Sequence, residues 1–184
     1  MHVEPAPASN HGPGAARLLL IEPNKNALGV MAKRLGELGY RLIACESADN
    51  AIAEMHRLPV DLVLAELRMA PMSGVELTRL IRDDTTLKET PVILVTGKSD
   101  SSGAVDGFAA GAEDVVAKPF HFEVLAARIA RRIARARAVK ELRHDNAALD
   151  ARVVTRAIEL GEIRAKFAQS EAERLRLEQL VSRG

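Results

Sequence analysis

Five short runs of aliphatic residues, with helical patterns between them, constrain the fold of this chain more than any other feature. The runs are Leu18–Ile21, Arg41–Cys45, Leu62–Ala65, Val92–Thr96 and Asp114–Ala117. They are continuous rather than alternating, which is typical of strands that are covered on both faces. Leu28, Met31 and Leu35 form one of the helical stripes, and Gly39 ends it. Strands that alternate with helices predict an α/β fold, a five-stranded parallel sheet with helices on both faces.

Two of the later helices carry local signals. Ser73 and Glu76 have the spacing of a capping box, which predicts the start of a third helix. A fourth helix is predicted from about Gly103 to Gly111. Gly103 and Gly107 each weaken a helix interior by about 1 kcal/mol relative to alanine, so we expect this helix to be the most mobile.

Composition excludes several classes of function. The net charge of +1 gives no general affinity for polyanions. The single cysteine, Cys45, excludes an internal disulfide and fits a reducing compartment, and the histidines lack the spacing of a zinc site. No apolar run reaches the length of a membrane span, and residues 1–15 lack the pattern of a signal peptide. We therefore expect a cytoplasmic protein without membrane contact, with a disordered leader over residues 1–15.

The carboxyl ends of the predicted strands carry four candidate functional residues. In an open parallel sheet, functional side chains gather beyond these strand ends, where the strand order reverses. That rule nominates Glu22, Glu66, Thr96 and Lys118. Such a set has the groups that phosphoryl transfer needs, because a carboxylate can accept a phosphoryl group while a lysine and a hydroxyl bind its oxygens.

The segments around these residues resemble the receiver domains of bacterial response regulators. The resemblance implies a flavodoxin-like fold and a role in two-component phosphorelay signal transduction, without enzymatic activity. It also implies a histidine kinase or an output protein as partner, and a phosphoacceptor aspartate with Mg²⁺ held by acidic residues. The likeness extends from Leu18 to about Arg132 and is carried by Asp61–Gly74, by Val95-Thr96-Gly97 and by Lys118-Pro119-Phe120.

Three single positions depart from the receiver pattern, and the Met-Pro pair of the loop is displaced to Met69-Ala70-Pro71. Glu66 stands where the family has its phosphoacceptor aspartate, and Pro23 stands where the family has a second acidic residue after the first strand. Glu22 and Glu66 alone offer at most a weak Mg²⁺ site, so we expect no cofactor. Val115 occupies the position of the family's aromatic switch residue. These departures identify a degenerate receiver, or pseudo-receiver; Lys118–Pro119 is a candidate cis peptide bond, as in the family.

Glu66 has three functional interpretations. The domain can be inert to phosphorylation and act as a fixed docking module, Glu66 can mimic the phosphorylated state, or it can itself accept a phosphoryl group. Pro23 argues against the third, and a carboxylate carries less charge and fewer acceptor oxygens than a phosphoryl group, which weakens the second. A purely structural alternative is that Lys118 pairs with Glu22 and Glu66 to relieve a buried charge cluster. We favour the docking module, with a phosphorylatable response regulator as the alternative.

Beyond the receiver-like domain, assigned to residues 16–137, residues 138–184 carry a heptad pattern that predicts a coiled coil. Asn146 at an a position favours a two-stranded parallel homodimer, whereas Arg156, Ser170 and Arg174 weaken the seam. The alternatives are a helix that folds back on its own domain, and disorder. Either this helix is itself the output or the chain is a fragment of a longer protein. The predicted dimer seam comprises Val139, Leu142, Asn146, Leu149, Val153, Leu160, Ile163, Phe167, Leu177 and Val181.

A basic stripe joins the two parts, and we expect it to be a solvated face. A basic helix followed by heptads is also the pattern of zipper proteins that bind DNA. However, Leu125, Ile129 and Ile133 must pack on the sheet, so this helix is not free to enter a groove. Nucleic acid is therefore the less favoured alternative to signalling through protein contacts. The stripe comprises Arg128, Arg131, Arg132, Arg135, Arg137, Lys140 and Arg143.

Overall fold

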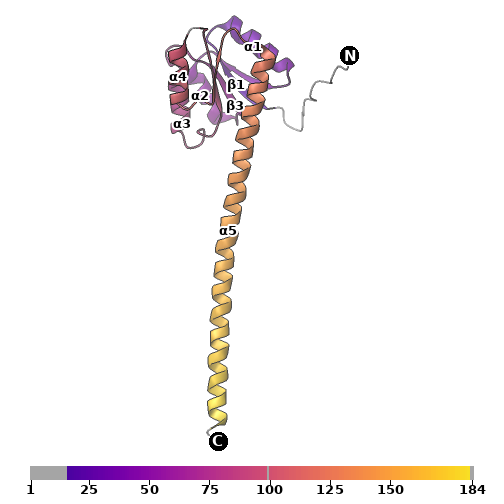
Figure 1. Ribbon diagram of the computed structural model, residues 1–184, viewed down its shortest axis with the longest axis vertical. Helices are drawn as coiled ribbons and strands as arrows, with labels where there is room; N and C mark the ends of the chain where they lie inside the picture. The colour runs from indigo at the N-terminus through magenta and orange to yellow at the C-terminus, as the bar shows by residue number, and fades with distance from the viewer. Residues whose placement is uncertain (1–15, 99, 183–184) are drawn as a thin grey trace, which may run out of the picture. The chain divides into compact units, whose positions relative to one another are not determined.

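Strands and helices alternate along the chain as the aliphatic runs predict (Figure 1). The structure, a computed structural model, describes residues 16–98 and 100–182, so the predicted leader over residues 1–15 lies outside the described residues. The predicted strands are confirmed, with β1 beginning one residue earlier and β3 ending one residue later. The elements are β1 (Arg17–Ile21), α1 (Lys25–Glu37), β2 (Arg41–Cys45), α2 (Ala48–Arg57), β3 (Leu62–Glu66), α3 (Gly74–Asp83), β4 (Val92–Thr96), α4 (Ser101–Ala109), β5 (Asp114–Ala117) and α5 (Phe122–Val181).

The five strands form one parallel sheet in the order β2-β1-β3-β4-β5, which confirms the predicted flavodoxin-like architecture. The strand order reverses next to β1, because β1 lies between β2 and β3. Functional residues are expected beyond the carboxyl ends of the strands at such a switch point. The topology therefore brings Glu22, Glu66, Thr96 and Lys118 to the same edge of the sheet.

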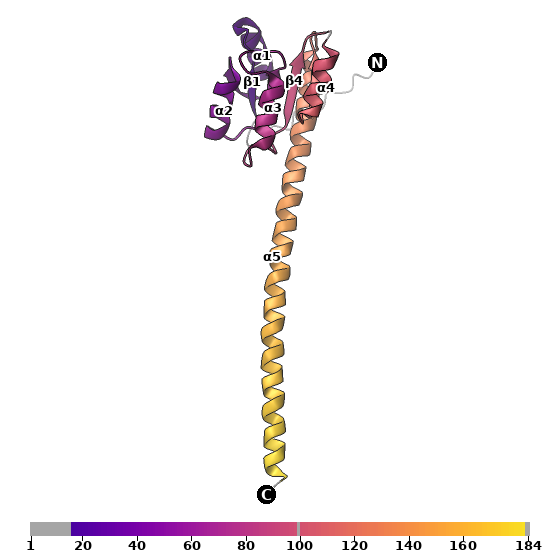
Figure 2. The same cartoon turned by 90° about the vertical axis from the view of Figure 1, so that its left-hand side faces the viewer.

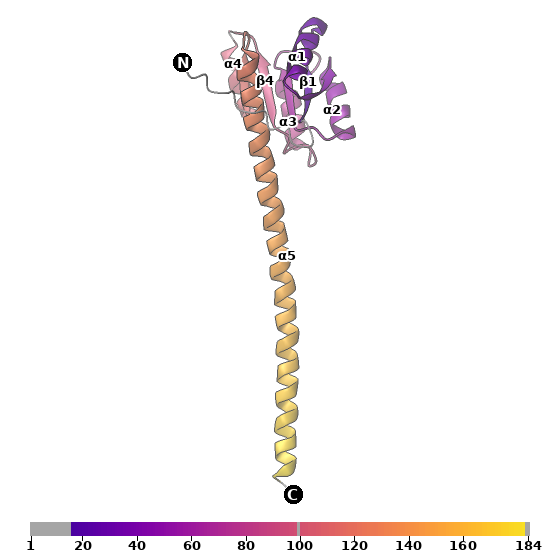
Figure 3. The same ribbon diagram turned by 90° about the vertical axis from the view of Figure 1, so that its right-hand side faces the viewer.

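Two hydrophobic cores lie on opposite faces of the sheet, because successive strand residues point to opposite sides. In β1, Leu18 and Leu20 pack in the core that α1 and α5 cover, whereas Leu19 and Ile21 pack in the core that α2 and α3 cover. All four side chains are buried, which explains why the aliphatic runs are continuous. Figures 2 and 3 show the two faces, with α2, α3 and α4 on one and α1 with the start of α5 on the other.

Helix α4 begins two residues before the predicted Gly103 and ends at Ala109. The earlier start has a clear cause, because the Asp100 side chain caps the helix and accepts a hydrogen bond from the Gly103 amide at 2.9 Å. Gly107 serves close packing: a Cβ added there would lie 2.9 Å from Leu94 Cδ1 and 3.3 Å from Val115 Cγ2. Gly107, which weakens this helix locally, therefore allows it to approach the sheet.

Helix α5 is a single helix that belongs to both of the compact units into which the chain divides, Met1–Arg137 and Ala138–Gly184. In the first unit, Leu125, Ile129 and Ile133 are buried in the sheet core. In the second unit, the large apolar side chains that the structure describes between Val139 and Phe167 are 37–67% exposed. Within the described part of the chain, none of the helices is apolar over the length that a bilayer crossing requires.

Candidate functional site

A lysine joined to two carboxylates forms the centre of the candidate site. Lys118 Nζ donates to Glu66 Oε2 at 2.6 Å and to Glu22 Oε2 at 2.7 Å. Lys118 directly follows β5, Glu66 is the last residue of β3, and Glu22 directly follows β1. Because β4 lies between β3 and β5, Lys118 reaches across the end of β4. The side chain of Glu22 is 7% exposed and that of Glu66 is 13% exposed, whereas the Lys118 side chain is 37% exposed. The structure therefore brings together three of the four residues nominated from the sequence.

Electrostatics hold Lys118 in its charged form. Burial by itself lowers the pKa of this lysine, but the hydrogen bonds to Glu22 and Glu66 outweigh burial, and the net pKa is raised. The other oxygen of Glu22 accepts a hydrogen bond from the Asn24 amide at 3.0 Å, which fixes the orientation of this carboxylate. The Lys118–Pro119 peptide bond is cis, and so is Ala70–Pro71.

The fourth nominated residue, Thr96, makes a different contact. Its hydroxyl donates to Asp100 Oδ2 at 3.3 Å, and its backbone oxygen accepts from the Lys118 amide at 2.7 Å. Arg68 binds the same Asp100 carboxylate through two hydrogen bonds, of 2.6 and 2.8 Å. The bonds from Arg68, and next the bond from the Gly103 amide, hold the pKa of Asp100 well below its usual range.

Sequence reasoning missed Arg68 and Asp100 as parts of this site. A local signal for Asp100 exists, because an aspartate just before Ser101 and three residues before a helical glycine fits an N-cap. No local signal pairs it with Arg68, which is 32 residues away in the chain and lies two residues after the end of β3.

The side chains at this edge do not fit a magnesium ion. Glu22 and Glu66 each give one oxygen to the Lys118 ammonium, and the other oxygen of Glu22 accepts from the Asn24 amide, so few carboxylate oxygens remain for a metal. Pro23 follows Glu22 directly and has no ligand atom in its side chain. Across residues 16–98 and 100–182, no three acidic, histidine or cysteine side chains gather in the geometry of a metal site.

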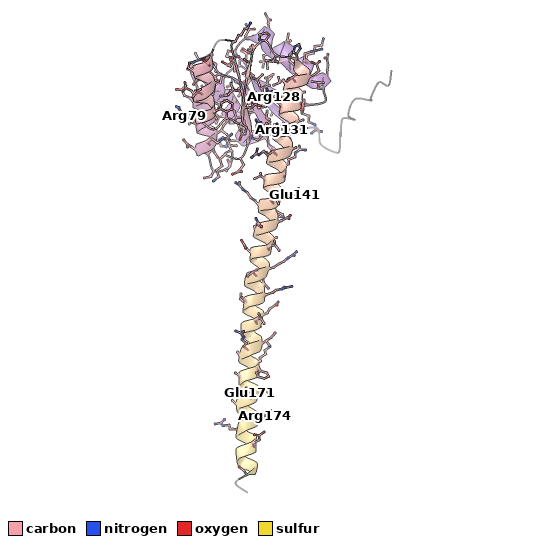
Figure 4. All side chains as sticks on the ribbon, viewed as in Figure 1. Arg79, Arg128, Arg131, Glu141, Glu171 and Arg174 are labelled. Carbon is pink, nitrogen blue, oxygen red and sulfur yellow. The ribbon has the colours of Figure 1, made fainter. Side chains whose placement is uncertain are left out.

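The sequence predicted that the basic stripe is a solvated face. For part of the stripe this is wrong, because three of its arginines form ion pairs. Arg128 on α5 (Figure 4) donates to both oxygens of the buried Asp114 at 3.0 and 2.9 Å, and Arg132 lies 3.4 Å from the same carboxylate. Arg137 donates to Asp61 at 2.7 Å. The partners lie on β5 and before β3, outside the helix that carries the stripe, so the helical pattern alone does not predict these ion pairs.

The predicted dimer seam lies on α5 in the second unit. Its described apolar members include Leu142, Val153, Ile163 and Phe167, which are 62–67% exposed. Two seam positions, Leu177 and Val181, lie outside the residues whose side chains the structure describes.

Comparison with known proteins places these features in a family. Residues 18–130 match the family model for the response regulator receiver domain. The chain is 33% identical over 127 residues to the transcriptional regulatory protein YvrH of Bacillus subtilis, covering 68% of this chain and 52% of the relative. It is 34% identical over 113 residues to the two-component response regulator PhoP of Pseudomonas aeruginosa, covering 61% of this chain and 49% of the relative. The chain thus spans about half the length of these curated relatives.

Solved structures show the same likeness. The signal receiver domain of a signal transduction histidine kinase from Syntrophus aciditrophicus is 28% identical with a TM-score of 0.61, and the match covers 65% of this chain and 91% of that one. The crystal structure of FixJ-N is also 28% identical with a TM-score of 0.62, and the match covers 66% and 96% of the two chains.

Proposed function

This chain belongs to the response regulator receiver domain family, and from that premise we propose that it is a two-component signalling module that acts through protein–protein contacts without normal aspartyl phosphorylation. The observation that carries the proposal is the hydrogen bond of 2.6 Å from Lys118 to the carboxylate of Glu66, which stands at the phosphoacceptor position. The partners we propose are a histidine kinase or an output protein in the cytoplasm.

The contacts around Glu66 support an inert receiver over a working one. Phosphoryl transfer to a carboxylate requires an in-line approach and groups that are free to bind the phosphoryl oxygens. Lys118, the cation that would bind them, already donates to Glu66 and Glu22. The Thr96 hydroxyl already donates to Asp100. Both groups are therefore satisfied by carboxylates of the chain itself.

The same contacts favour a fixed docking module over a mimic of the phosphorylated state. A mimic would direct the charge of Glu66 to both Lys118 and Thr96. Glu66 does contact Lys118, but the Thr96 hydroxyl donates to a different carboxylate, that of Asp100. A single planar carboxylate shared with a lysine also lacks the charge and the third acceptor oxygen of a phosphoryl group.

Restoring the family residues tests this proposal. We expect Glu66→Asp combined with Pro23→Asp to gain one phosphoryl group from acetyl phosphate and Mg²⁺, because the pair supplies a shorter nucleophile and a second carboxylate for the metal. Intact-protein mass spectrometry measures the gain. Glu66→Asp combined with Pro23→Ala is the matched control, since it removes the proline without adding a ligand. Equal modification of the two variants would contradict the importance of the lost carboxylate.

We also propose that the second unit forms a parallel two-stranded coiled coil with a second copy of this chain. Its described apolar seam is exposed in the single chain, and isolated long helices need such packing to persist. In a parallel pair in register, Glu159 attracts Arg164 of the other copy and Lys166 attracts Glu171, whereas the pairs Asp145–Asp150 and Glu173–Glu178 repel, so we expect the association to be modest. Nucleic acid is a weaker candidate partner, because Arg128 and Arg132 are already paired with Asp114.

Two isoleucines of the second unit allow a matched test of the dimer. Ile163 occupies the seam and Ile158 does not, yet their side chains are 62% and 60% exposed. We expect Ile163→Glu to weaken dimerisation by about 2 kcal/mol or more, over roughly tenfold in affinity, because the side chain is buried only in the dimer. Ile158→Glu should leave dimerisation unchanged. Analytical ultracentrifugation measures both, and a full chain that stays monomeric at high micromolar concentration would refute the dimer.

A further inference from the structure

An ion pair connects the two loops that border the candidate site. Arg68 follows β3, and Asp100 is the N-cap of α4 after β4. The guanidinium binds both oxygens of the carboxylate, at 2.6 and 2.8 Å, which is the strongest geometry available to such a pair. The Asp100 side chain is 19% exposed, and the Arg68 side chain is 62% exposed, so the pair lies at the surface of the site.

Asp100 is also the point where three parts of the domain meet. Besides Arg68, its carboxylate accepts hydrogen bonds from the Thr96 hydroxyl at the end of β4 and from the Gly103 amide in the first turn of α4. The absence of a side chain at Gly103 makes this arrangement possible, because a Cβ there would lie 2.5–2.7 Å from the atoms of the Asp100 carboxylate. The sequence of this segment is therefore fitted to hold the carboxylate in place.

Further along α4, the helix is packed tightly on the position where the family has its switch residue. That position holds Val115, whose branched side chain has restricted χ1 freedom. Gly107 lies directly over it, since an added Cβ would come within 3.3 Å of Val115 Cγ2. Near this end of the sheet, both the N-terminal cap and the middle of α4 are thus held by contacts within the chain.

We propose that Arg68, Asp100 and Thr96 form a latch that holds the connection between β4 and α4 in one conformation. The latch engages the hydroxyl that a transferred phosphoryl group would otherwise bind. This inference rests on the proposed function and extends it, because it explains how the α4 side of the domain keeps a constant shape without phosphorylation. Arg68 is the positioning residue of the latch, and Asp100 is the group it positions.

Amide hydrogen exchange in the full chain tests the latch. We expect Arg68→Gln to speed amide exchange at Gly103 and Ala104 by about two- to fivefold, the effect expected for the loss of one bidentate ion pair at the surface. Arg68→Lys should give a smaller increase in exchange rate, because it keeps the positive charge and loses only the bidentate geometry. The matched control is Arg79→Gln, the same change on α3 (Figure 4), which should leave exchange at both amides unchanged. Equal exchange in wild type and Arg68→Gln would overturn the latch.

A second readout separates failure of the latch from failure of the proposed function. In the Glu66→Asp, Pro23→Asp background, adding Asp100→Ala should raise the initial rate of phosphorylation by acetyl phosphate by about two- to fivefold, because the Thr96 hydroxyl loses its acceptor and becomes free to bind a phosphoryl oxygen. An unchanged rate, together with unchanged amide exchange, refutes the latch alone. Phosphorylation of the wild-type chain instead refutes the proposed function, whatever the exchange data show.

Discussion

Removing Lys118 is the most informative perturbation of this domain, because one ammonium compensates two carboxylates that are only 7% and 13% exposed. The variant Lys118→Met keeps the length of the side chain and removes its charge. Glu22 and Glu66 then face each other without a cation in a largely buried position.

The expected cost follows from the burial of the three groups. Breaking a buried ion pair by removing one partner costs about 3–5 kcal/mol. Lys118 itself is 37% exposed, so solvent already screens part of this interaction. We therefore expect Lys118→Met to lower the free energy of unfolding by about 2–3 kcal/mol, which corresponds to a fall in Tm of roughly 5–10 °C.

Urea unfolding monitored by tyrosine fluorescence measures this cost in the first unit alone, because Tyr40 is the single tyrosine and the chain has no tryptophan. Tyr40 donates to the Ala126 backbone oxygen on α5 at 3.3 Å, so its signal reports on the packing of that helix on the sheet. Lys33→Met, at an exposed position of α1, is the control for the loss of a lysine charge.

A second charge change tests the reason for the effect. Adding Glu66→Gln to Lys118→Met removes one of the two uncompensated carboxylates, so the double variant should recover about 1 kcal/mol relative to Lys118→Met. If Lys118→Met costs no more than Lys33→Met, or if the double variant is less stable still, the charge cluster is not what this lysine stabilises.

Two further predictions follow from the same structure. Gly107→Ala should lower the free energy of unfolding by about 1–3 kcal/mol, because its Cβ would lie 2.9 Å from Leu94. Gly161→Ala has open space around the added Cβ and should stabilise α5 by about 0.5–1 kcal/mol. Thermal denaturation measures both changes. Because the pKa of Lys118 is raised in the folded chain, its contribution to stability is complete below the unfolded-state pKa of about 10.4 and is lost as pH rises through the higher folded pKa. The stability difference between wild type and Lys118→Met should thus shrink in urea titrations at strongly alkaline pH. A difference that stays constant from about pH 9 to about pH 12, on both sides of the unfolded-state lysine pKa of about 10.4, would contradict this.

The sequence predicts the fold well because burial leaves few alternatives for the strands. A run such as Leu18–Ile21, with every side chain buried, has no solvent face and therefore reads as a central strand of a covered sheet. The stripe of Leu125, Ile129 and Ile133 likewise identifies the part of α5 that packs on the sheet. These signals are local, and the structure has the strands and the packed part of α5 at the predicted residues.

The candidate site is only partly readable from sequence. The topological rule brings Glu22, Glu66 and Lys118 together because strand ends are fixed by the sheet. The pairs Arg68–Asp100 and Arg128–Asp114 depend instead on the paths of loops and on the rotamers of long side chains, which leave no periodic signal. For that reason Thr96 was assigned to the correct edge of the sheet but not to its actual hydrogen-bond partner, Asp100.

The most direct test of the central proposal is the intact mass of the wild-type chain after incubation with Mg²⁺ and acetyl phosphate, beside the Glu66→Asp, Pro23→Asp variant as positive control. We expect the variant to gain one phosphoryl group and the wild type to keep its original mass. A wild-type chain that gains a phosphoryl group, mapped to Glu66 or to a neighbouring residue, would show that the receiver is a working phosphoacceptor and would contradict the proposal.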